Sequence, residues 1–397
     1  MSDDGIRRAL EQVPLPDEVG AAERAWRLVD AAFESREPVR WTRSHRGLVL
    51  ALAAAALATA VVLVAVLTPP GQAVVDRFRD AVGREPSEPA LTRLPAPGRL
   101  LVLSSDGPWI VHEDGSKRLL GDYDDASWSP RGLFVVATRG RQLVALDSES
   151  GEPRWSLSRA EPVRDPRWSG GGLDTRIAYR AGDTLHVVAG DGSPDEVVAD
   201  GVASIAPAWK PDSHVLAYAD ASGRVHVVDV DSRRELWHTG TLKQVRELAF
   251  FGNRLVVSTA SRVIVSRLGK QIPFLHLPPG HVLLDTLLVP FGGVLYADYD
   301  PRTDSTALFS SDCTVTGACA LMPDTRRFEG PGRIGNLIMS PDTSWIAAGW
   351  PAADQFLFFR RIPHRLGKVD AVSNVTGEFS PGGETGGIFP VITGWAP

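Results

Sequence analysis

Ser127-Trp128-Ser129-Pro130 is the first clear copy of a turn that recurs through the C-terminal three quarters of this 397-residue chain. The later copies, in which an aromatic or apolar residue again precedes Pro or Gly, are Arg167-Trp168-Ser169-Gly170, Ala208-Trp209-Lys210-Pro211, Ala249-Phe250-Phe251-Gly252, Leu288-Val289-Pro290-Phe291-Gly292, Ile338-Met339-Ser340-Pro341 and Gly394-Trp395-Ala396-Pro397. The first four copies are 40 or 41 residues apart. A period of about 40 residues indicates one small sheet per repeat, the pattern of β-propellers.

The residues between successive turns have the composition of strands. Two apolar runs rich in Val, Ile and aromatic residues follow each turn, for example 133–138 and 143–146, and a more polar run such as 153–157 follows them. Gly, Asp, Ser and Pro separate the runs, as expected of short strands joined by tight turns. No stretch of 97–397 has helical periodicity over three turns. The sequence therefore predicts an all-β domain over 97–397.

The last copy of the turn is placed to close the ring. The segment 97–120 supplies strands at 100–103 and 109–111 but lacks the turn strand before them, whereas 388–397 supplies such a strand with nothing after it. Pairing Trp395 and its neighbours with 100–103 would complete one blade from both ends of the domain and leave no open sheet edge. We therefore expect a seven-bladed β-propeller closed by its C-terminal strand, with about 43 residues per blade.

Two motifs carry a resemblance to known propeller families. Trp128-Ser129-Pro130-Arg131-Gly132 resembles the W-S-P-D-G turn of TolB-type and WD-repeat-like propellers. Residues 145–155, Ala-Leu-Asp-Ser-Glu-Ser-Gly-Glu-Pro-Arg-Trp, resemble the A-x-D-x-x-T-G-x-x-x-W docking motif of quinoprotein-like propellers, and 228–237 is a degraded second copy. Quinoprotein dehydrogenases repeat this motif in most blades of a longer chain with cofactor and metal ligands. This chain has one good copy and no recognisable ligand set, so the resemblance implies the fold and no cofactor.

The turn tryptophans have two possible roles. One large ring per blade can pack between neighbouring sheets, where it buries about 150–250 Å². The alternative is stacking against a ligand. We favour the structural role for the blade aromatics, which are Trp128, Trp168, Trp209 and Trp395.

Residues 47–67 are predicted to cross a membrane. This segment is 21 residues long and uncharged, and at about 1.5 Å per residue it spans a hydrocarbon core of about 30 Å. The alternatives are a buried helix or a signal peptide, but 46 residues precede the segment, too many for a signal peptide. Arginines are more frequent before the segment than after it: Arg36, Arg40, Arg43 and Arg46 against Arg77 and Arg79. This bias places the N-terminus in the cytoplasm and the propeller outside, as in a single-pass protein of the cell membrane.

Two further features concern the segments around the span. Residues 68–96 have one amphipathic stretch and then several prolines, which predicts an extracytoplasmic stalk. Cys313 and Cys319 are the only cysteines, and both fall in the predicted external domain. A pair at the base of a short loop outside the cytosol favours a local disulfide, with metal binding as the alternative.

The predicted cytoplasmic tail, residues 1–46, is too short for an ordinary core of its own. Its second helical stretch carries one apolar stripe, formed by Val19, Ala22, Trp26, Val29 and Phe33. A cytoplasmic protein is our preferred partner for this stripe; the inner leaflet, a second copy and a disordered tail are the alternatives. A short helical tail, one span and an external domain resemble the layout of bacterial anti-sigma factors and related regulators. The His-x-x-x-Cys-x-x-Cys zinc motif of the best-known anti-sigma class is missing.

No catalytic, cofactor or metal site is predicted. The sequence has no nucleotide-binding Gly-rich motif, no G-x-S-x-G elbow and no H-E-x-x-H. His112, His186 and His226 are expected on different blades at positions that are not equivalent. Other groups weighed as ligands are His276 with His281, and Asp298, Asp300 and Asp304, which resemble a calcium loop with Phe309 in place of its glutamate.

The function predicted from these features is binding. The net charge of −6 and the pI of about 5.9 disfavour a nucleic-acid partner. We expect a membrane-anchored extracytoplasmic propeller that acts as a non-catalytic binding or scaffold module for a protein, glycan or small ligand. The alternative is a transmembrane signalling regulator, similar to an anti-sigma factor, whose tail binds a cytoplasmic partner. An enzyme would require acids or histidines that converge in the channel, and the spacing predicts no such cluster.

Overall fold

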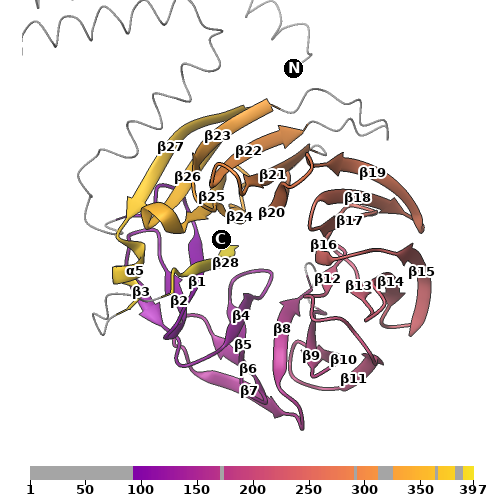
Figure 1. Ribbon diagram of the computed structural model, residues 1–397. Helices are drawn as coiled ribbons and strands as arrows, with labels where there is room; N and C mark the ends of the chain where they lie inside the picture. The colour runs from indigo at the N-terminus through magenta and orange to yellow at the C-terminus, as the bar shows by residue number, and fades with distance from the viewer. Residues whose placement is uncertain (1–92, 170–173, 290–292, 312–324, 363–364, 381–387) are drawn as a thin grey trace, which may run out of the picture. The chain divides into compact units, whose positions relative to one another are not determined.

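The computed structural model describes residues 93–397 except 170–173, 290–292, 312–324, 363–364 and 381–387. Within these residues the chain forms seven four-stranded antiparallel sheets, arranged as the blades of a propeller (Figure 1). The predicted tail, the predicted span 47–67 and Cys313 and Cys319 lie outside the described residues. Over the described ranges no helix combines the length and apolar character needed to cross a membrane.

Each blade repeats the same strand order from the channel outward. Blade 1 contains β28 (Val391–Ala396), β1 (Arg99–Ser104), β2 (Gly107–Val111) and β3 (Lys117–Leu119). Blade 2 contains β4 (Asp125–Trp128), β5 (Phe134–Arg139), β6 (Gln142–Asp147) and β7 (Pro153–Ser158). Blade 3 contains β8 (Val163–Trp168), β9 (Arg176–Ala181), β10 (Thr184–Ala189) and β11 (Asp195–Ala199). Blade 4 contains β12 (Ala208–Trp209), β13 (Val215–Ala219), β14 (Arg224–Asp229) and β15 (Arg234–Thr241).

The remaining blades follow the same plan. Blade 5 contains β16 (Val245–Phe251), β17 (Arg254–Thr259), β18 (Arg262–Arg267) and β19 (Lys270–His276). Blade 6 contains β20 (Val282–Val289), β21 (Gly293–Asp300), β22 (Ser305–Ser311) and β23 (Thr325–Pro331). Blade 7 contains β24 (Gly335–Met339), β25 (Trp345–Trp350), β26 (Gln355–Ile362) and β27 (Arg365–Ser373). A 3₁₀ turn, η2 (Pro351–Ala353), joins β25 to β26, and a one-turn helix, α5 (Val375–Glu378), follows β27.

The two ends of the propeller share blade 1. Strand β28 pairs antiparallel with β1, with Trp395 opposite Leu100, Ile392 opposite Val102 and Val391 opposite Leu103. The prediction of a seven-bladed ring closed by the C-terminal strand is therefore confirmed. The physical gain is that β1 has a hydrogen-bonded neighbour on both sides and exposes no edge.

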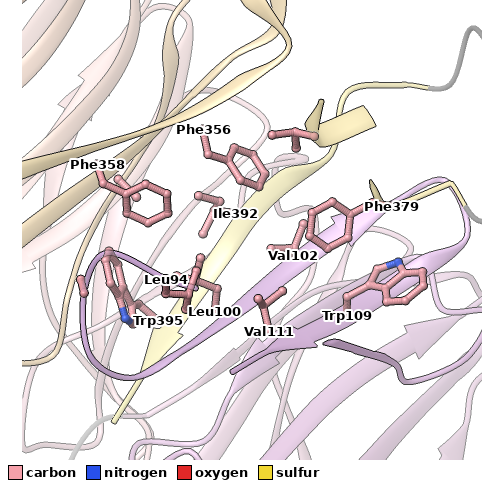
Figure 2. Close-up of a cluster of buried hydrophobic side chains, with 13 residues drawn as sticks. Leu94, Leu100, Val102, Trp109, Val111, Phe356, Phe358, Phe379, Ile392 and Trp395 are labelled. Atoms are coloured by element: carbon pink, nitrogen blue, oxygen red, sulfur yellow. The ribbon is translucent and has the colours of Figure 1, made fainter. Parts of the chain in front are cut away.

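The hydrophobic core is divided among the interfaces between blades. One cluster lies between blades 7 and 1, where Phe356 and Phe358 of β26 meet Ile392 and Trp395 of β28 (Figure 2). The ring of Trp395 packs edge-on against Phe358 with their centroids 6.0 Å apart. Similar clusters occupy the other interfaces. Because both faces of a blade are buried, the inner strands are apolar along their length, and each fully buried large side chain contributes about 1.5–3 kcal/mol.

Candidate functional site

The four turn tryptophans lie at the interfaces between blades. Trp128 belongs to the cluster between blades 1 and 2, and Trp168 stacks on Phe134 of blade 2 with a centroid distance of 6.4 Å and an angle of 18°. Trp209 packs between blades 3 and 4. Trp209 and Trp395 each donate the Nε1 hydrogen to a backbone carbonyl, at 2.8 Å and 3.0 Å. These contacts are those of packing residues, although Trp168 also lines the cavity described next.

A cavity of about 620 Å³ opens between blades 2 and 3, and we call it the blade 2–3 groove. Its apolar wall contains Phe134, Trp155 and Trp168, which are all partly buried, and beside them the Leu133 side chain is 55% exposed. The exposed charged residues that line it are Arg131, Arg154, Asp174 and Asp191. Concave sites of 300–1,000 Å³ with aromatic walls and a few polar groups are the usual form of ligand sites in proteins.

The motif at 145–155 builds one wall of this groove. Asp147 accepts hydrogen bonds from the backbone N–H groups of residues 149 and 150, both at 2.9 Å. The hydrogen bond from Arg154 is the largest cause that lowers the pKa of the Asp147 carboxyl. The turn positions Trp155, whose Nε1 hydrogen is donated to the carbonyl of Gly190 in blade 3 at 3.0 Å. The last residue of the motif therefore docks blade 2 onto blade 3 and fixes the shape of the groove.

A second cavity, of about 490 Å³, lies near the starts of the innermost strands of blades 5 to 7 and contains two carboxyl groups. Thr286 donates its hydroxyl hydrogen to Oε2 of Glu247 at 3.0 Å, and Ser258 contacts the Thr286 hydroxyl at 2.7 Å. Asp285 accepts the backbone N–H of Thr286 at 2.7 Å and that of Leu337 at 2.6 Å. Each carboxyl is thus held by donors of the protein itself.

Burial shifts the titration of this acid pair. Burial raises the pKa of Glu247, and the charge of neighbouring Asp285 raises it further. Burial also raises the pKa of Asp285, although three backbone N–H donors oppose the shift. The Arg167 guanidinium lowers the pKa of Glu247 and also that of Asp125, whose pKa burial raises. Glu247 and Asp285, with the Arg167 charge acting on Glu247, form a polar cluster that the sequence did not predict, and we call it the channel cluster. The spacing of the two acids could have indicated this cluster. Glu247 and Asp285 lie 38 residues apart, about one repeat, and each is near the start of an innermost strand.

The structure corrects one expectation about the histidines. His186 and His226 do occupy equivalent positions, 40 residues apart on the third strands of blades 3 and 4. Each ring stacks on a tyrosine of the preceding strand, Tyr179 or Tyr218, with a centroid distance of 5.1 Å. For these two histidines the prediction of different positions was wrong, because strand register, rather than the spacing of the turns, decides which residues face each other. His112 follows β2 directly and is not equivalent to them.

His281 and the three acids weighed as ligands are held in local pairs, whereas His276 is the last residue of β19 and takes no part in these pairs. His281 Nδ1 lies 2.9 Å from Asp298 Oδ1 and its Nε2 lies 3.7 Å from Asp300 Oδ2. Asp304 accepts the hydroxyl hydrogen of Tyr299 at 2.9 Å, so it does not join the other two acids. The stripe residues Val19, Ala22, Trp26, Val29 and Phe33, like the two cysteines, lie outside the described residues.

Comparison with known proteins agrees with the fold. The family model described as outer membrane protein assembly factor BamB matches residues 126–267, which is less than half of the chain. The match includes the motif at 145–155 and agrees with its quinoprotein-like resemblance. The sequence matches no curated protein.

Two solved structures are similar over most of the propeller. Kluyveromyces lactis Hsv2 has 12% identity and a TM-score of 0.51, with 69% of this chain and 95% of that chain covered. The β-propeller domain of Myceliophteria thermophila Cps50 (Swd1) has 14% identity and a TM-score of 0.50, with 68% of this chain and 99% of that chain covered. At such identities the likeness concerns the propeller fold alone.

Proposed function

We propose that this protein is a membrane-anchored extracytoplasmic propeller that binds a partner protein without catalysis, and that the blade 2–3 groove is the contact site. The observation that carries the proposal is the aromatic wall of Phe134, Trp155 and Trp168 beside the exposed Leu133. Such a surface accepts an apolar or aromatic side chain, and charged residues of both signs around it supply polar contacts.

The groove is suited to binding because its walls are held in place. Trp155 is tied to blade 3 by its hydrogen bond to Gly190 at 3.0 Å, and Phe134 stacks on Trp168. A ligand therefore does not have to order these side chains, which lowers the entropic cost of association. The closed ring adds rigidity, since a shift of one blade is resisted by two neighbours.

The location is supported by the uncharged segment 47–67 and its flanking arginines. The matching family model is named for the assembly of outer membrane proteins. This name favours a scaffold in the cell envelope over a cytoplasmic role.

A non-catalytic role is supported by the state of the channel acids. Asp285 uses both carboxylate oxygens to accept backbone N–H groups, at 2.7 Å and 2.6 Å, and Glu247 accepts a hydrogen bond from Thr286. Asp285 is thereby satisfied within the protein, as a structural acid requires, and one oxygen of Glu247 is engaged in the same way. The chemistry of a general acid or base would instead need an oxygen directed at a substrate.

Site-specific photocrosslinking in the native envelope tests the proposal. A benzophenone amino acid at position 133, in the groove, is expected to crosslink one extracytoplasmic protein. The same probe at position 268 is the control, because Leu268 is 77% exposed and lies in the turn between β18 and β19 of blade 5. Equal crosslinking at both positions, or none at position 133, would contradict a partner site in the groove.

The regulator alternative rests on the apolar stripe that includes Trp26 and Phe33 in the predicted tail. Removing residues 1–46 while keeping the span separates the two functions. If the protein is an envelope scaffold, the truncated chain still gives the crosslink at position 133 and keeps the cellular function of the full chain. Loss of the cellular function with the crosslink intact would instead favour signalling through the tail.

A further inference from the structure

The outer half of blade 4 brings two histidines and a glutamate together. His226 lies on β14, and Glu235 and His238 lie on β15 (Figure 1 shows both strands). Nδ1 of His226 is 2.6 Å from one carboxylate oxygen of Glu235, and Nδ1 of His238 is 2.7 Å from the other. One ligand atom from each residue falls within 4.8 Å of the other two. Nitrogen and oxygen donors in this number are the set that binds borderline divalent metals such as zinc.

A β-bulge produces this convergence. His226 stands directly opposite His238, and the register then passes from Val227 opposite Trp237 to Val228 opposite Glu235, which leaves residue 236 unpaired. Side chains three positions apart on a regular strand point to opposite faces. The extra residue at the bulge puts Glu235 and His238 on the same face, together with His226.

A second carboxylate orients one of the histidines. Nε2 of His226 lies 3.1 Å from Oδ2 of Asp220, while Nδ1 faces Glu235. The other oxygen of Asp220 is held by the backbone N–H groups of residues 222 and 224, at 2.8 Å and 3.0 Å. A histidine that ligates a metal through one nitrogen usually donates the other N–H to a carboxylate, and this contact fixes its tautomer. The stack on Tyr218 holds the ring plane.

Blade 3 has an equivalent cluster in which an arginine takes the place of the second histidine. Its His186 also approaches an acid, Asp195, with Nδ1 and Oδ2 separated by 3.3 Å. There Arg159 pairs with Asp195, and the residue opposite His186 is Val197. In blade 4 the equivalent acid, Glu235, is paired with His226 and His238. One blade thus neutralises its acid with arginine, whereas the other surrounds two carboxylates with imidazoles.

We propose that His226, Glu235 and His238 form a binding site for a divalent transition-metal ion, with Zn²⁺ as the best fit, and that Asp220 orients His226 toward the ion. The site is empty. Its three ligands leave one tetrahedral position for water or an external ligand, and the side chains of Glu235 and His238 are 41% and 49% exposed, so solvent reaches that position. His226 is 16% exposed and forms the inner side of the site.

The geometry can accept the ion with small movements. Zinc bonds of 2.0–2.1 Å at a tetrahedral angle separate two ligand atoms by about 3.3 Å. Each histidine now contacts a different oxygen of Glu235, at 2.6 Å and 2.7 Å, so an ion on either oxygen needs that separation to widen by roughly 0.7 Å. The other histidine has to approach from a position within the 4.8 Å that bounds the three ligand atoms. The Glu235 and His238 side chains are 41% and 49% exposed, so rotation of these two side chains is the expected route to that geometry.

Metal titration of the purified full-length chain in detergent tests the site. After removal of metals with a chelator, wild type is expected to bind one equivalent of Co²⁺ per chain at this site. The bound Co²⁺ should give visible absorption bands and be displaced by Zn²⁺. Zn²⁺ should also raise the midpoint of thermal unfolding. If wild type gives neither saturable binding nor a thermal shift, the cluster is an ion-pair network and the proposal is wrong.

Three variants locate the binding. His238→Val introduces the residue that blade 3 has at the matching position and should weaken Zn²⁺ binding at least tenfold. Asp220→Asn should weaken it by about 10–100-fold, as expected when a carboxylate that orients a ligating histidine is lost. His186→Ala is the matched control and should bind Zn²⁺ like wild type. Unchanged affinity in His238→Val, or an equal loss in His186→Ala, would overturn the assignment.

Discussion

Trp395 lies directly opposite Leu100 in the strand pair β28–β1, so the last strand of the chain completes the first blade. Its Nε1 hydrogen is donated to the carbonyl of Pro97 at 3.0 Å, and its ring packs edge-on against Phe358 of blade 7. One side chain thus joins the start of the propeller, its end and the neighbouring blade. Trp395 therefore contributes to the closure of the ring through three different contacts.

The first prediction concerns this closure. Trp395→Ala is expected to lower the free energy of unfolding by about 3–5 kcal/mol, the usual cost of removing a buried large aromatic side chain. Urea denaturation followed by tryptophan fluorescence measures the change. Ile388→Ala is the control, because Ile388 precedes β28 and is 77% exposed. A loss below 1 kcal/mol for Trp395→Ala would mean that the ring does not rely on this strand.

The second prediction concerns the pH dependence of stability. Glu247 has an ordinary pKa near 4.5 in the unfolded chain and a raised pKa in the folded protein. A raised carboxyl pKa stabilises the fold at low pH, and this contribution is lost as the pH rises above 4.5 through the folded value. Glu247→Gln removes the ionisation, so it should stabilise the protein at pH 9 relative to wild type by about 1 kcal/mol or more. At pH 4 the two proteins should unfold alike. Thermal unfolding of both proteins at both pH values measures this effect. An equal difference in stability between variant and wild type at pH 4 and pH 9 would contradict the raised pKa of Glu247.

The third prediction concerns the turn that faces Trp155. Gly192 has φ +94°, and a Cβ atom there would lie 2.9 Å from the Trp155 ring. Gly201 also has a positive φ, +67°, but a Cβ atom there would meet nothing within 4 Å. Both alanine variants carry a left-handed backbone cost of about 1–2 kcal/mol. Gly192→Ala should be the more destabilised of the two, because it also displaces Trp155 and distorts the groove. Chemical denaturation of both variants tests this order, and equal stabilities would show that Trp155 yields freely.

The fourth prediction concerns the arginine of blade 3. Arg159 donates its Nε hydrogen to the Tyr179 hydroxyl at 2.8 Å and pairs with Asp195, whose pKa is lowered although burial opposes the shift. Arg159→Met should cost about 1–3 kcal/mol at pH 7, because it removes the guanidinium that pairs with the partly buried Asp195 and leaves that carboxylate to the Tyr179 hydroxyl and His186. A carboxyl with a lowered pKa loses its stabilising contribution as the pH falls. The difference in the free energy of unfolding between Arg159→Met and wild type should therefore be smaller at pH 3 than at pH 7, as measured by chemical denaturation.

Arg233→Met is the control for this prediction. Arg233 pairs with Glu196, the neighbour of Asp195, but the two side chains are 72% and 39% exposed. Exposed pairs contribute about 0–1 kcal/mol. A loss of stability in this variant as large as that in Arg159→Met would argue against a special role for the Tyr179–Asp195 contact.

Much of the fold could be predicted from the repeated turn, of which the copy at Trp128 is the first, because each copy marks the end of an innermost strand. The expected strands at 133–138 and 143–146 correspond to β5 and β6, within one residue at most ends. The helix α5 had no such signal, since four residues are too few for helical periodicity. Its neighbour Phe379 is nevertheless fully buried against Trp109 and Phe356.

The candidate sites were less accessible to sequence reasoning. The channel cluster joins Glu247 to residues of other blades, and the groove joins Leu133 to Trp168 across an interface. Distances between residues of different blades depend on how the blades pack, which the repeat does not encode. The histidine cluster needs the bulge at residue 236, and a single unpaired residue leaves no mark in the hydrophobic pattern.

The sequence by itself determined the all-β class, the number of blades and the pairing of the C-terminal strand, because these depend on local period and on the missing strand at 97–120. Tertiary structure alone decided where the aromatic groove opens, why Glu247 and Asp285 are drawn into one polar cluster, and how Glu235 comes to face two histidines. The physical reason is that strand propensity acts along the chain, whereas burial, charge and ligand geometry arise between blades and across strands.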